Sequence, residues 1–319
     1  MERRKFGVTD LEVSALCLGT MQFGWTADEA AAIEVMDAFV AAGGNFIDTA
    51  DVYSRWAQGN PGGVAESIIG RWLKKRGNRD KLVIATKVAM PVWDGPDGKG
   101  LGRNHIVQAV EKSLSRLQIE TIDLYQSHAP DLETPIEETL RAFDDLIQSG
   151  KVRYIGASNY TAPQLEEALA VAGERSLARY ISLQPNYSLV NRHEFEDALA
   201  ALCLRERIAV IPYSPLAGGF LTGKYRPDRP QPKSARTYQT RRYENEAGWR
   251  VIEALEVIAR ARETTLAAVA VAWLLAKPVI TSPILGANSE EQLAAILPAV
   301  DLHLSPEGVA ALDEISAGV

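Results

Sequence analysis

The stretch that decides the fold is NFIDTADVY, residues 45–53. Its short apolar run stops at the carboxylate of Asp48, and Tyr53 follows five residues later in a segment too polar and irregular to continue a strand. Lys87 and His128 occur in the same setting, because each directly follows a β-rich run further along the chain. Any fold for this chain therefore has to explain four titratable side chains at or just beyond strand ends.

Strand-like and helix-like segments alternate along almost the whole chain. Runs rich in β-branched and apolar residues predict the strands, and apolar residues at helical spacing predict the helices between them. The expected strands are residues 15–19, 45–48, 82–86, 122–127, 152–157, 180–184, 208–213 and 279–285. The expected helices are residues 28–42, 65–75, 104–117, 134–149, 161–171, 246–262 and 265–276, with one more between strands six and seven and a last one from residue 289.

This alternation favours one particular α/β fold. Eight apolar strands, each followed by a helix, are the pattern of a (β/α)8 barrel. An open doubly wound sheet is the alternative, and it favours a Gly-x-Gly-x-x-Gly turn after the first strand. The turn here reads LGTMQFG, residues 18–24, which does not fit. We therefore expect a single TIM-barrel domain over residues 1–319, with residues 216–245 forming a long loop over the barrel mouth after strand seven.

The composition limits the classes of function. Of the 319 residues, 46% are hydrophobic and 24% are charged, which is ordinary for a soluble globular enzyme. A net charge of −7 without a block of basic residues argues against nucleic acid as a partner, and no apolar run is long enough to span a membrane. Cys17 and Cys203 lie in apolar surroundings without a partner at metal-ligand spacing. We expect buried free thiols, no metal site and a cytoplasmic location.

The four strand-end residues form a coherent chemical set. A lysine ammonium beside a tyrosine favours the phenolate and lowers the pKa of the phenol, and a carboxylate beside the lysine keeps the lysine charged. A histidine across the pocket can donate to a carbonyl oxygen. Taken singly, an aspartate, tyrosine or histidine in such a place is more often a cap, a packed aromatic or a satisfied polar group. Together they can polarise a carbonyl and transfer a proton, and a cofactor must supply any hydride.

Aromatic side chains are expected near the same rim. Trp25, Trp56 and Trp93 follow strands one, two and three. Three indoles at one rim favour a substrate pocket lined by aromatic side chains, and packing within the loops is the alternative.

Six segments in this order resemble the aldo-keto reductases, and the match runs from about residue 3 to residue 297. That family is a TIM barrel that uses NADP(H), less often NAD(H), to reduce aldehydes and ketones. The resemblance implies that Tyr53 is the general acid, that Lys87 and Asp48 tune it, and that His128 orients the carbonyl. The matching segments are residues 44–53, 84–87, 123–128, 155–160, 184–187 and 213–216.

The resemblance also implies a set of cofactor contacts. Ser158, Asn159 and Gln184 would hold the nicotinamide carboxamide, and Tyr213 would stack on the nicotinamide ring. Further implied contacts are Ser214, Leu216, Gly218 and Lys224 around the pyrophosphate, and Gly286, Asn288 and Gln292 at the adenosine end.

The adenosine end is also where the chain departs from the family. A Glu-Asn pair usually meets the adenine there, but this chain has Ala295 and Ile296. Preference for NADP over NAD rests on basic residues for the 2′-phosphate. Lys233 and Arg236 in the long loop are the candidates, and solvated loop charge is the alternative.

Two functions follow from the resemblance. The leading one is an NADP(H)-dependent oxidoreductase that acts on a small carbonyl compound. The alternative is a cofactor-binding regulatory subunit with little turnover, similar to the potassium-channel β-subunits. Those subunits retain the four strand-end residues, so the residues alone do not separate the two functions.

Overall fold

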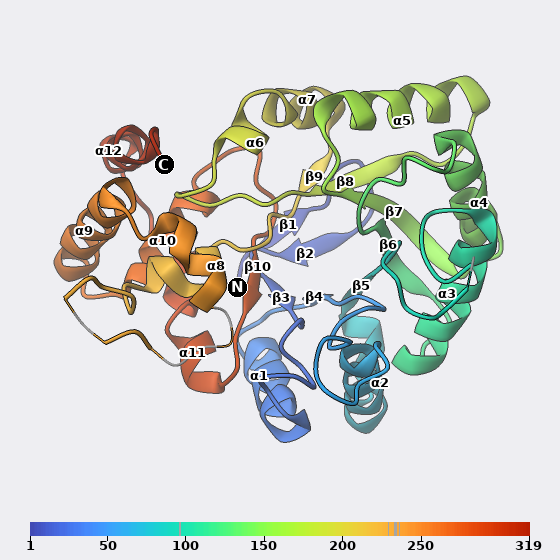
Figure 1. Ribbon diagram of the computed structural model, residues 1–319, viewed down its shortest axis with the longest axis horizontal. Coiled ribbons are helices and arrows are strands. Elements are labelled where there is room, and N and C mark those ends of the chain that lie inside the picture. Colours follow the sequence, from blue (N-terminus) through green and yellow to red (C-terminus); the bar gives the residue numbers. More distant parts are fainter. Residues whose placement is uncertain (96, 229, 233–234, 236) are drawn as a thin grey trace.

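Eight parallel strands form the centre of the molecule, and helices surround them (Figure 1). The computed structural model describes residues 1–95, 97–228, 230–232, 235 and 237–319. The strands are β3 (Cys17–Gly19), β4 (Phe46–Asp48), β5 (Val83–Val88), β6 (Ile122–Ser127), β7 (Val152–Ser158), β8 (Tyr180–Gln184), β9 (Ala209–Val210) and β10 (Ile284–Gly286). From β3 to β9 each strand pairs with the next one along the chain, and β10 pairs with β3. The predicted (β/α)8 fold is confirmed.

The barrel closes between β9 and β10. The carbonyl of Val210 accepts the N–H of Thr281 at 2.8 Å, and the carbonyl of Pro212 accepts the N–H of Ile284 at 2.9 Å. Both strands are shorter than the predicted seventh and eighth strands, in part because Pro212 has no N–H to donate to a ladder. Since all eight strands are parallel, their carboxyl ends meet at one mouth.

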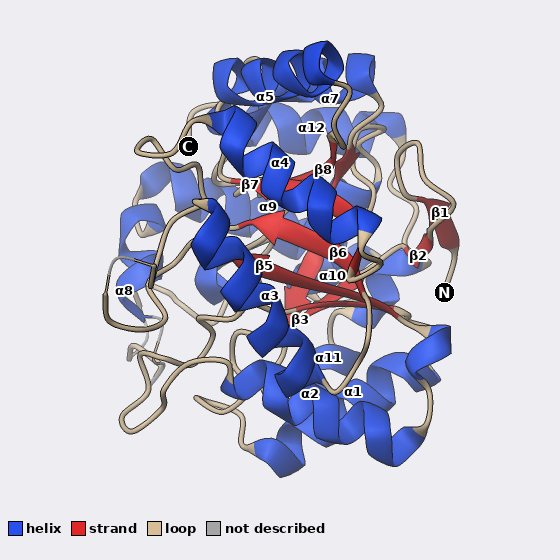
Figure 2. Cartoon of the chain, turned by 90° about the vertical axis from the view of Figure 1, so that its right-hand side faces the viewer, coloured by secondary structure: helices blue, strands red, loops and turns tan. Residues whose placement is uncertain are grey.

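The helices cover the outside of the barrel (Figure 2). Their apolar residues are buried against it. On α4 (Ile136–Gln148), for example, Leu140 and Phe143 are fully buried, while Glu138 and Asp145 are exposed. No helix in the described part of the chain is long and apolar enough to cross a membrane. The other helices are α1 (Glu29–Ala41), α2 (Val64–Arg76), α3 (Arg103–Leu117), α5 (Ala162–Arg175), α6 (His193–Glu196), α7 (Leu199–Glu206), α8 (Thr237–Thr240), α9 (Glu246–Ala261), α10 (Leu266–Leu275), α11 (Glu290–Ala294) and α12 (Pro306–Ser316).

An antiparallel hairpin that was not predicted fills the amino-terminal end of the barrel. It consists of β1 (Arg3–Lys5) and β2 (Glu12–Ser14). Phe6 is fully buried between the two strands and meets Phe46 edge-to-face, with ring centroids 5.5 Å apart. In Figure 2 the hairpin lies at one end of the strands and α8 lies at the opposite end. The hairpin therefore closes the end away from the mouth.

The expected long loop after β9 contains short helical turns in its described part. They are the 3-10 helices Ala217–Thr222 and Arg241–Tyr243, with α8 between them. Phe220 anchors this segment, because it is fully buried and its ring lies 5.2 Å from that of Trp249 on α9. The described part of the segment is thus a structured wall of the mouth rather than an open loop.

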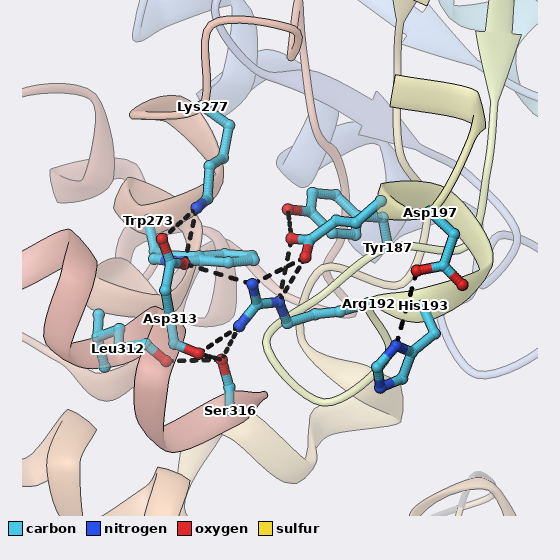
Figure 3. A network of polar contacts seen from close by, with 10 residues as sticks. Tyr187, Arg192, His193, Asp197, Trp273, Lys277, Leu312, Asp313 and Ser316 are labelled. Carbon is cyan, nitrogen blue, oxygen red and sulfur yellow. Dashed lines mark hydrogen bonds and ion pairs between the residues drawn. The ribbon is translucent and has the colours of Figure 1, made fainter. Parts of the chain in front are cut away.

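The C-terminal helix α12 is tied to the barrel by a polar network (Figure 3). Arg192 donates to the carboxylate of Glu196 at 2.8 to 3.0 Å and to the main-chain carbonyl of Asp313 at 2.5 Å. The carboxylate of Asp313 accepts from the indole of Trp273 at 2.8 Å and from Lys277 at 2.7 Å. Helix α12 was not predicted, and this network joins it to α6 and α10.

Candidate active site

Lys87 lies at the centre of the strand-end residues. Its side chain is fully buried, and its ammonium nitrogen is 2.6 Å from Oδ2 of Asp48 and 2.9 Å from the hydroxyl of Tyr53. A third bond, of 2.9 Å, goes to the main-chain carbonyl of Thr49. These bonds use all three ammonium protons, so Lys87 is fixed between the carboxylate and the phenol.

Asp48 is held on its other oxygen as well. Its Oδ1 accepts from the side-chain amide of Gln126 at 3.0 Å and from that of Gln184 at 2.9 Å. Gln126 was not predicted, because its strand also contains Asp123 and Ser127 and no signal singles it out. Gln184 was expected to contact the cofactor, and its amide also binds Asp48.

The electrostatics of the pair set the protonation of Tyr53. Burial lowers the pKa of Lys87, but the charge of Asp48 and the contact with Tyr53 outweigh this effect and raise the pKa above its ordinary value. Burial raises the pKa of the Tyr53 phenol, and the opposing charge of Lys87 does not offset it. Lys87 therefore lowers the pKa of Tyr53 as predicted, but the net pKa stays above its ordinary value because burial has the larger effect. Tyr53 is a protonated phenol with a proton to donate.

His128 is neutral. Burial, followed by the charge of Lys87, lowers the pKa of its imidazole to about 3. Its ring centroid lies 6.0 Å from that of Tyr53, and its buried Nδ1 has no hydrogen-bond partner among the described residues. A neutral imidazole keeps one N–H, so it can donate to a carbonyl oxygen without carrying charge.

These residues surround a cavity of about 1230 Å³ at the mouth of the barrel. Asp48, Tyr53 and His128 line it, and Lys87 lies buried beneath them. All the cofactor-binding residues expected within the described part of the chain also line it. They are Ser158, Asn159, Gln184, Tyr213, Ser214, Leu216, Gly218, Lys224, Gly286, Asn288 and Gln292.

The wall opposite Tyr53 is held by hydrogen bonds between neighbouring strand ends. Asn159 has a left-handed backbone, with φ of 62°, and its side-chain amide donates to the main-chain carbonyl of His128 at 2.8 Å. Its Oδ1 accepts from the hydroxyl of Tyr213 at 2.9 Å, and the hydroxyl of Ser158 donates to the main-chain carbonyl of Gln184 at 2.9 Å. These hydrogen bonds fix the side chains of Ser158, Asn159 and Tyr213, which were expected to contact the nicotinamide.

The glycines after β9 let the chain bend tightly beside a lysine. Gly218 and Gly219 have φ of 68° and 98°, values that side chains with a Cβ rarely adopt. A Cβ at Gly219 would lie 3.2 Å from the ammonium of Lys224. Here a main chain without side chains lies beside a cation, in a conformation that glycine adopts readily. Such a segment allows a pyrophosphate to approach closely.

The expected adenosine end of the cavity is largely apolar. Ala295 and Ile296, which stand in place of the family's Glu-Asn pair, do line the cavity together with Thr265 and Ala267. Asn288 also lines it and accepts from the hydroxyl of Thr26 at 2.6 Å. The apolar side chains there could contact the face of a base, and the polar groups could contact its edge.

The three tryptophans do not share one position. Trp56 lines the cavity, and Trp25 supports it edge-on, with ring centroids 5.7 Å apart. Trp93 turns away. Its ring lies 4.8 Å from that of His105, and the ammonium of Lys112 sits 3.4 Å from its centroid. Neither Trp25 nor Trp93 lines the cavity, so of the three tryptophans expected at the substrate pocket only Trp56 does.

Lys233 and Arg236, the candidates for the 2′-phosphate, lie outside the described residues.

The fold and the site are those of an α/β barrel with a buried lysine, carboxylate and phenol at the strand ends. The model of the Aldo/keto reductase family matches residues 15–317. The chain belongs to this family.

Its relatives include proteins with different descriptions. "Uncharacterized oxidoreductase YrpG" of Bacillus subtilis (strain 168) is 40% identical over 325 aligned residues, covering 100% of this chain and 97% of that protein. "Protein tas" of Escherichia coli (strain K12) is 35% identical, with 99% and 97% covered. "Probable voltage-gated potassium channel subunit beta" of Arabidopsis thaliana is also 35% identical, with 95% and 92% covered.

Proposed function

We propose that the protein is an NADP(H)-dependent reductase of aldehydes and ketones, with Tyr53 as the proton donor. The observation that carries the proposal is the contact of 2.9 Å between the Tyr53 hydroxyl and the Lys87 ammonium at the floor of an open cavity. A protonated phenol bound to a buried cation can release its proton to an alkoxide and leave a stabilised phenolate.

The free thiols Cys17 and Cys203 are buried, which supports the proposed cytoplasmic location.

Each side chain has a separate role in this proposal. Tyr53 donates its proton to the carbonyl oxygen as the alcohol forms. Lys87 stabilises the phenolate left behind, and Asp48 keeps Lys87 charged and in place. His128 donates a hydrogen bond that orients the carbonyl. A bound nicotinamide cofactor supplies the hydride.

The cavity fits such a cofactor along its length. Ser158, Asn159 and Gln184 would bind the carboxamide, and Tyr213 would meet the nicotinamide ring. Lys224 beside the glycine backbone would bind the pyrophosphate. We propose NADP(H) ahead of NAD(H), with Lys233 and Arg236 as the groups that would read the 2′-phosphate.

The regulatory alternative has support from relatives that are named as potassium-channel β-subunits. It predicts tight binding of NADPH with negligible turnover. The reductase proposal predicts turnover of NADPH with at least one member of a panel of aldehydes, ketones and sugars.

The test follows the loss of reduced-cofactor absorbance with NADPH and with NADH. Replacing a positioned general acid lowers kcat by roughly 10²- to 10⁴-fold, so Tyr53→Phe should do so here. NADPH binding, measured by quenching of tryptophan fluorescence, should be retained, because the hydroxyl is not among the proposed cofactor contacts. Tight NADPH binding without turnover of any substrate would favour the regulatory function instead.

A further inference from the structure

The charges of the cavity do not balance. Among the described residues that line it, the charged side chains are those of Asp48, Arg55 and Lys224. Asp48 is neutralised by Lys87 at 2.6 Å. Neither Arg55 nor Lys224 forms an ion pair with a carboxylate that the structure describes. In a chain with a net charge of −7, this cavity therefore contains two cations without a counterion.

The two cations belong to different walls of the cavity. Lys224 lies beside Gly219 in the segment after β9, where the proposed function places the cofactor phosphates. Arg55 is two residues beyond Tyr53 on the loop after β4, next to Trp56. The cofactor phosphates account for Lys224, and Arg55 remains as a cation beside the proton donor.

Arg55 is held in place rather than extended into solvent. Its Nη1 donates to the main-chain carbonyl of Pro91, on the loop after β5. Its stem lies over Gly62, where an added Cβ would be 3.6 Å from the Cβ of Arg55. The side chain is half-buried, and its Nε and Nη2 groups have no acceptor among the described residues. The guanidinium is thus positioned in advance, with donors still free.

We propose that Arg55 makes the cavity selective for carbonyl compounds that carry a carboxylate. A guanidinium offers a planar fork of donors that matches a carboxylate in two parallel hydrogen bonds. The only carboxylate of the described lining, Asp48, is paired and does not repel such a substrate. The half-exposed indole of Trp56, which lines the cavity and lies 6.2 Å from the ring of Tyr53, adds an apolar surface suited to an aromatic or aliphatic body.

This inference rests on the proposed reductase function, and it competes with a simpler role for Arg55. If the hydrogen bond to Pro91 were its only function, Arg55 would be a structural link between the loops after β4 and β5. Loss of a structural link would lower kcat/KM for charged and neutral substrates alike. Recognition of a carboxylate would affect only the charged ones, so a ratio of two substrates separates the roles.

The experiment compares kcat/KM for 2-, 3- and 4-formylbenzoate with kcat/KM for their methyl esters. The three isomers vary the distance from carbonyl to carboxylate, and the esters remove the charge at the cost of one added methyl group. Variants are Arg55→Met, which keeps the apolar stem, and Arg55→Lys, which keeps the charge but not the fork. Arg205→Gln removes an exposed charge from α7 and serves as the control.

We expect at least one isomer to be preferred over its ester by the wild type. Because hydrogen bonds to charged groups are worth more than neutral ones, Arg55→Met should lower that ratio by about tenfold or more. Arg55→Lys should restore part of the ratio, and Arg205→Gln should leave it unchanged. An equal loss for acids and esters in Arg55→Met, or no preference in the wild type for any isomer, would overturn the inference.

A binding measurement keeps the inference testable if no aldehyde is reduced. In the presence of NADPH, benzoate should quench tryptophan fluorescence at lower concentration than methyl benzoate, and Arg55→Met should abolish the difference. The absence of turnover would then refute the reductase function alone. Equal binding of acid and ester to the wild type would refute the role of Arg55.

Discussion

At the scale of single residues, the site is organised around a proton that stays on Tyr53. Burial raises the pKa of the phenol more than Lys87 lowers it, so the resting site holds a neutral donor beside a cation. In the proposed reaction, Lys87 would contribute after proton transfer, when the phenolate would lie beside its ammonium, now 2.9 Å from the hydroxyl. Electrostatic stabilisation that acts only on the developing charge accelerates a reaction more than one that acts on the resting state.

Asp51, three residues after Asp48, carries the residue-scale prediction. Its side chain is buried, and neither carboxylate oxygen has a hydrogen-bond partner among the described residues. Burial, followed by the nearby charge of Glu66, raises its pKa well above the ordinary value. Between the ordinary and the raised pKa, the unfolded chain has lost the proton that the folded chain retains. Asp51 therefore lowers the stability of the fold as pH rises through that window.

We expect Asp51→Asn to relieve this cost. Its free energy of unfolding at pH 7 should exceed that of the wild type by on the order of 1 kcal/mol or more, since one pKa unit corresponds to about 1.4 kcal/mol. The difference should vanish below about pH 4, where both states bind the proton. Urea titrations between pH 3.5 and about 8 measure it, with exposed Asp301→Asn as the control. A variant that is less stable than the wild type at pH 7 would refute a protonated Asp51.

Sequence reasoning reached most of the site because strand ends are recognisable. A polar residue that follows an apolar run marks the mouth of a barrel, and Asp48, Lys87 and His128 were found in this way. Gln126 was not, because a polar residue inside a strand does not reveal which partner it meets across the barrel. Trp93 was misplaced because a position in a loop does not determine the direction of a side chain.

At the scale of elements, helices with a continuous apolar face were predicted closely, and elements that depend on distant contacts were not. Helix α3 and strand β6 match their predicted ranges to within a residue. The β1–β2 hairpin was missed because its first strand, Arg3–Lys5, is entirely charged and gains its apolar contacts from the adjacent Phe6. Helix α12 buries little of its own surface and depends on the network around Arg192.

This network leads to the element-scale prediction. The side chain of Arg192 is only 12% exposed. Its replacement by methionine removes the guanidinium from Glu196 and from the carbonyl of Asp313, and among the described residues Glu196 keeps only the hydrogen bond from Tyr187. Breaking a buried pair by removing one partner costs about 3–5 kcal/mol, and the partial exposure of Glu196 reduces this to about 2 kcal/mol. Urea denaturation of Arg192→Met should show that loss.

A matched surface pair provides the comparison for Arg192→Met. Arg205 and Glu166 are 60% and 53% exposed, and exposed pairs contribute about 0–1 kcal/mol. Arg205→Met should therefore change the free energy of unfolding by less than about 1 kcal/mol. Similar losses in the two variants would show that the network does not hold α12, and hydrogen exchange in α12 should accelerate only in Arg192→Met.

At the scale of the whole molecule, the two ends of the chain are joined through the barrel. The guanidinium of Arg4 donates to the main-chain carbonyl of Ile280 at 3.2 Å. The hydroxyl of Ser282 donates to the main-chain carbonyl of Ser14 at 2.9 Å. The hairpin therefore binds the segment before β10, and β10 in turn pairs with β3. Because the circle of strands is closed, neither half can be removed without exposing the interior of the other.

We therefore expect residues 1–319 to unfold as one cooperative domain. Trp72 on α2 and Trp273 on α10 are almost fully buried in different parts of the barrel, so tryptophan fluorescence reports on both. Its unfolding midpoint should coincide with that of far-UV circular dichroism, the ordinary test of two-state behaviour. Because the cavity is lined by residues from both halves, NADPH at 100 times its Kd should stabilise both probes together, by about 2.7 kcal/mol. The chain has six tryptophans, so the difference in fluorescence between the wild type and Trp72→Phe, or Trp273→Phe, isolates the signal of the replaced reporter. A midpoint that NADPH shifts for only one of these two signals would show that the barrel melts in parts.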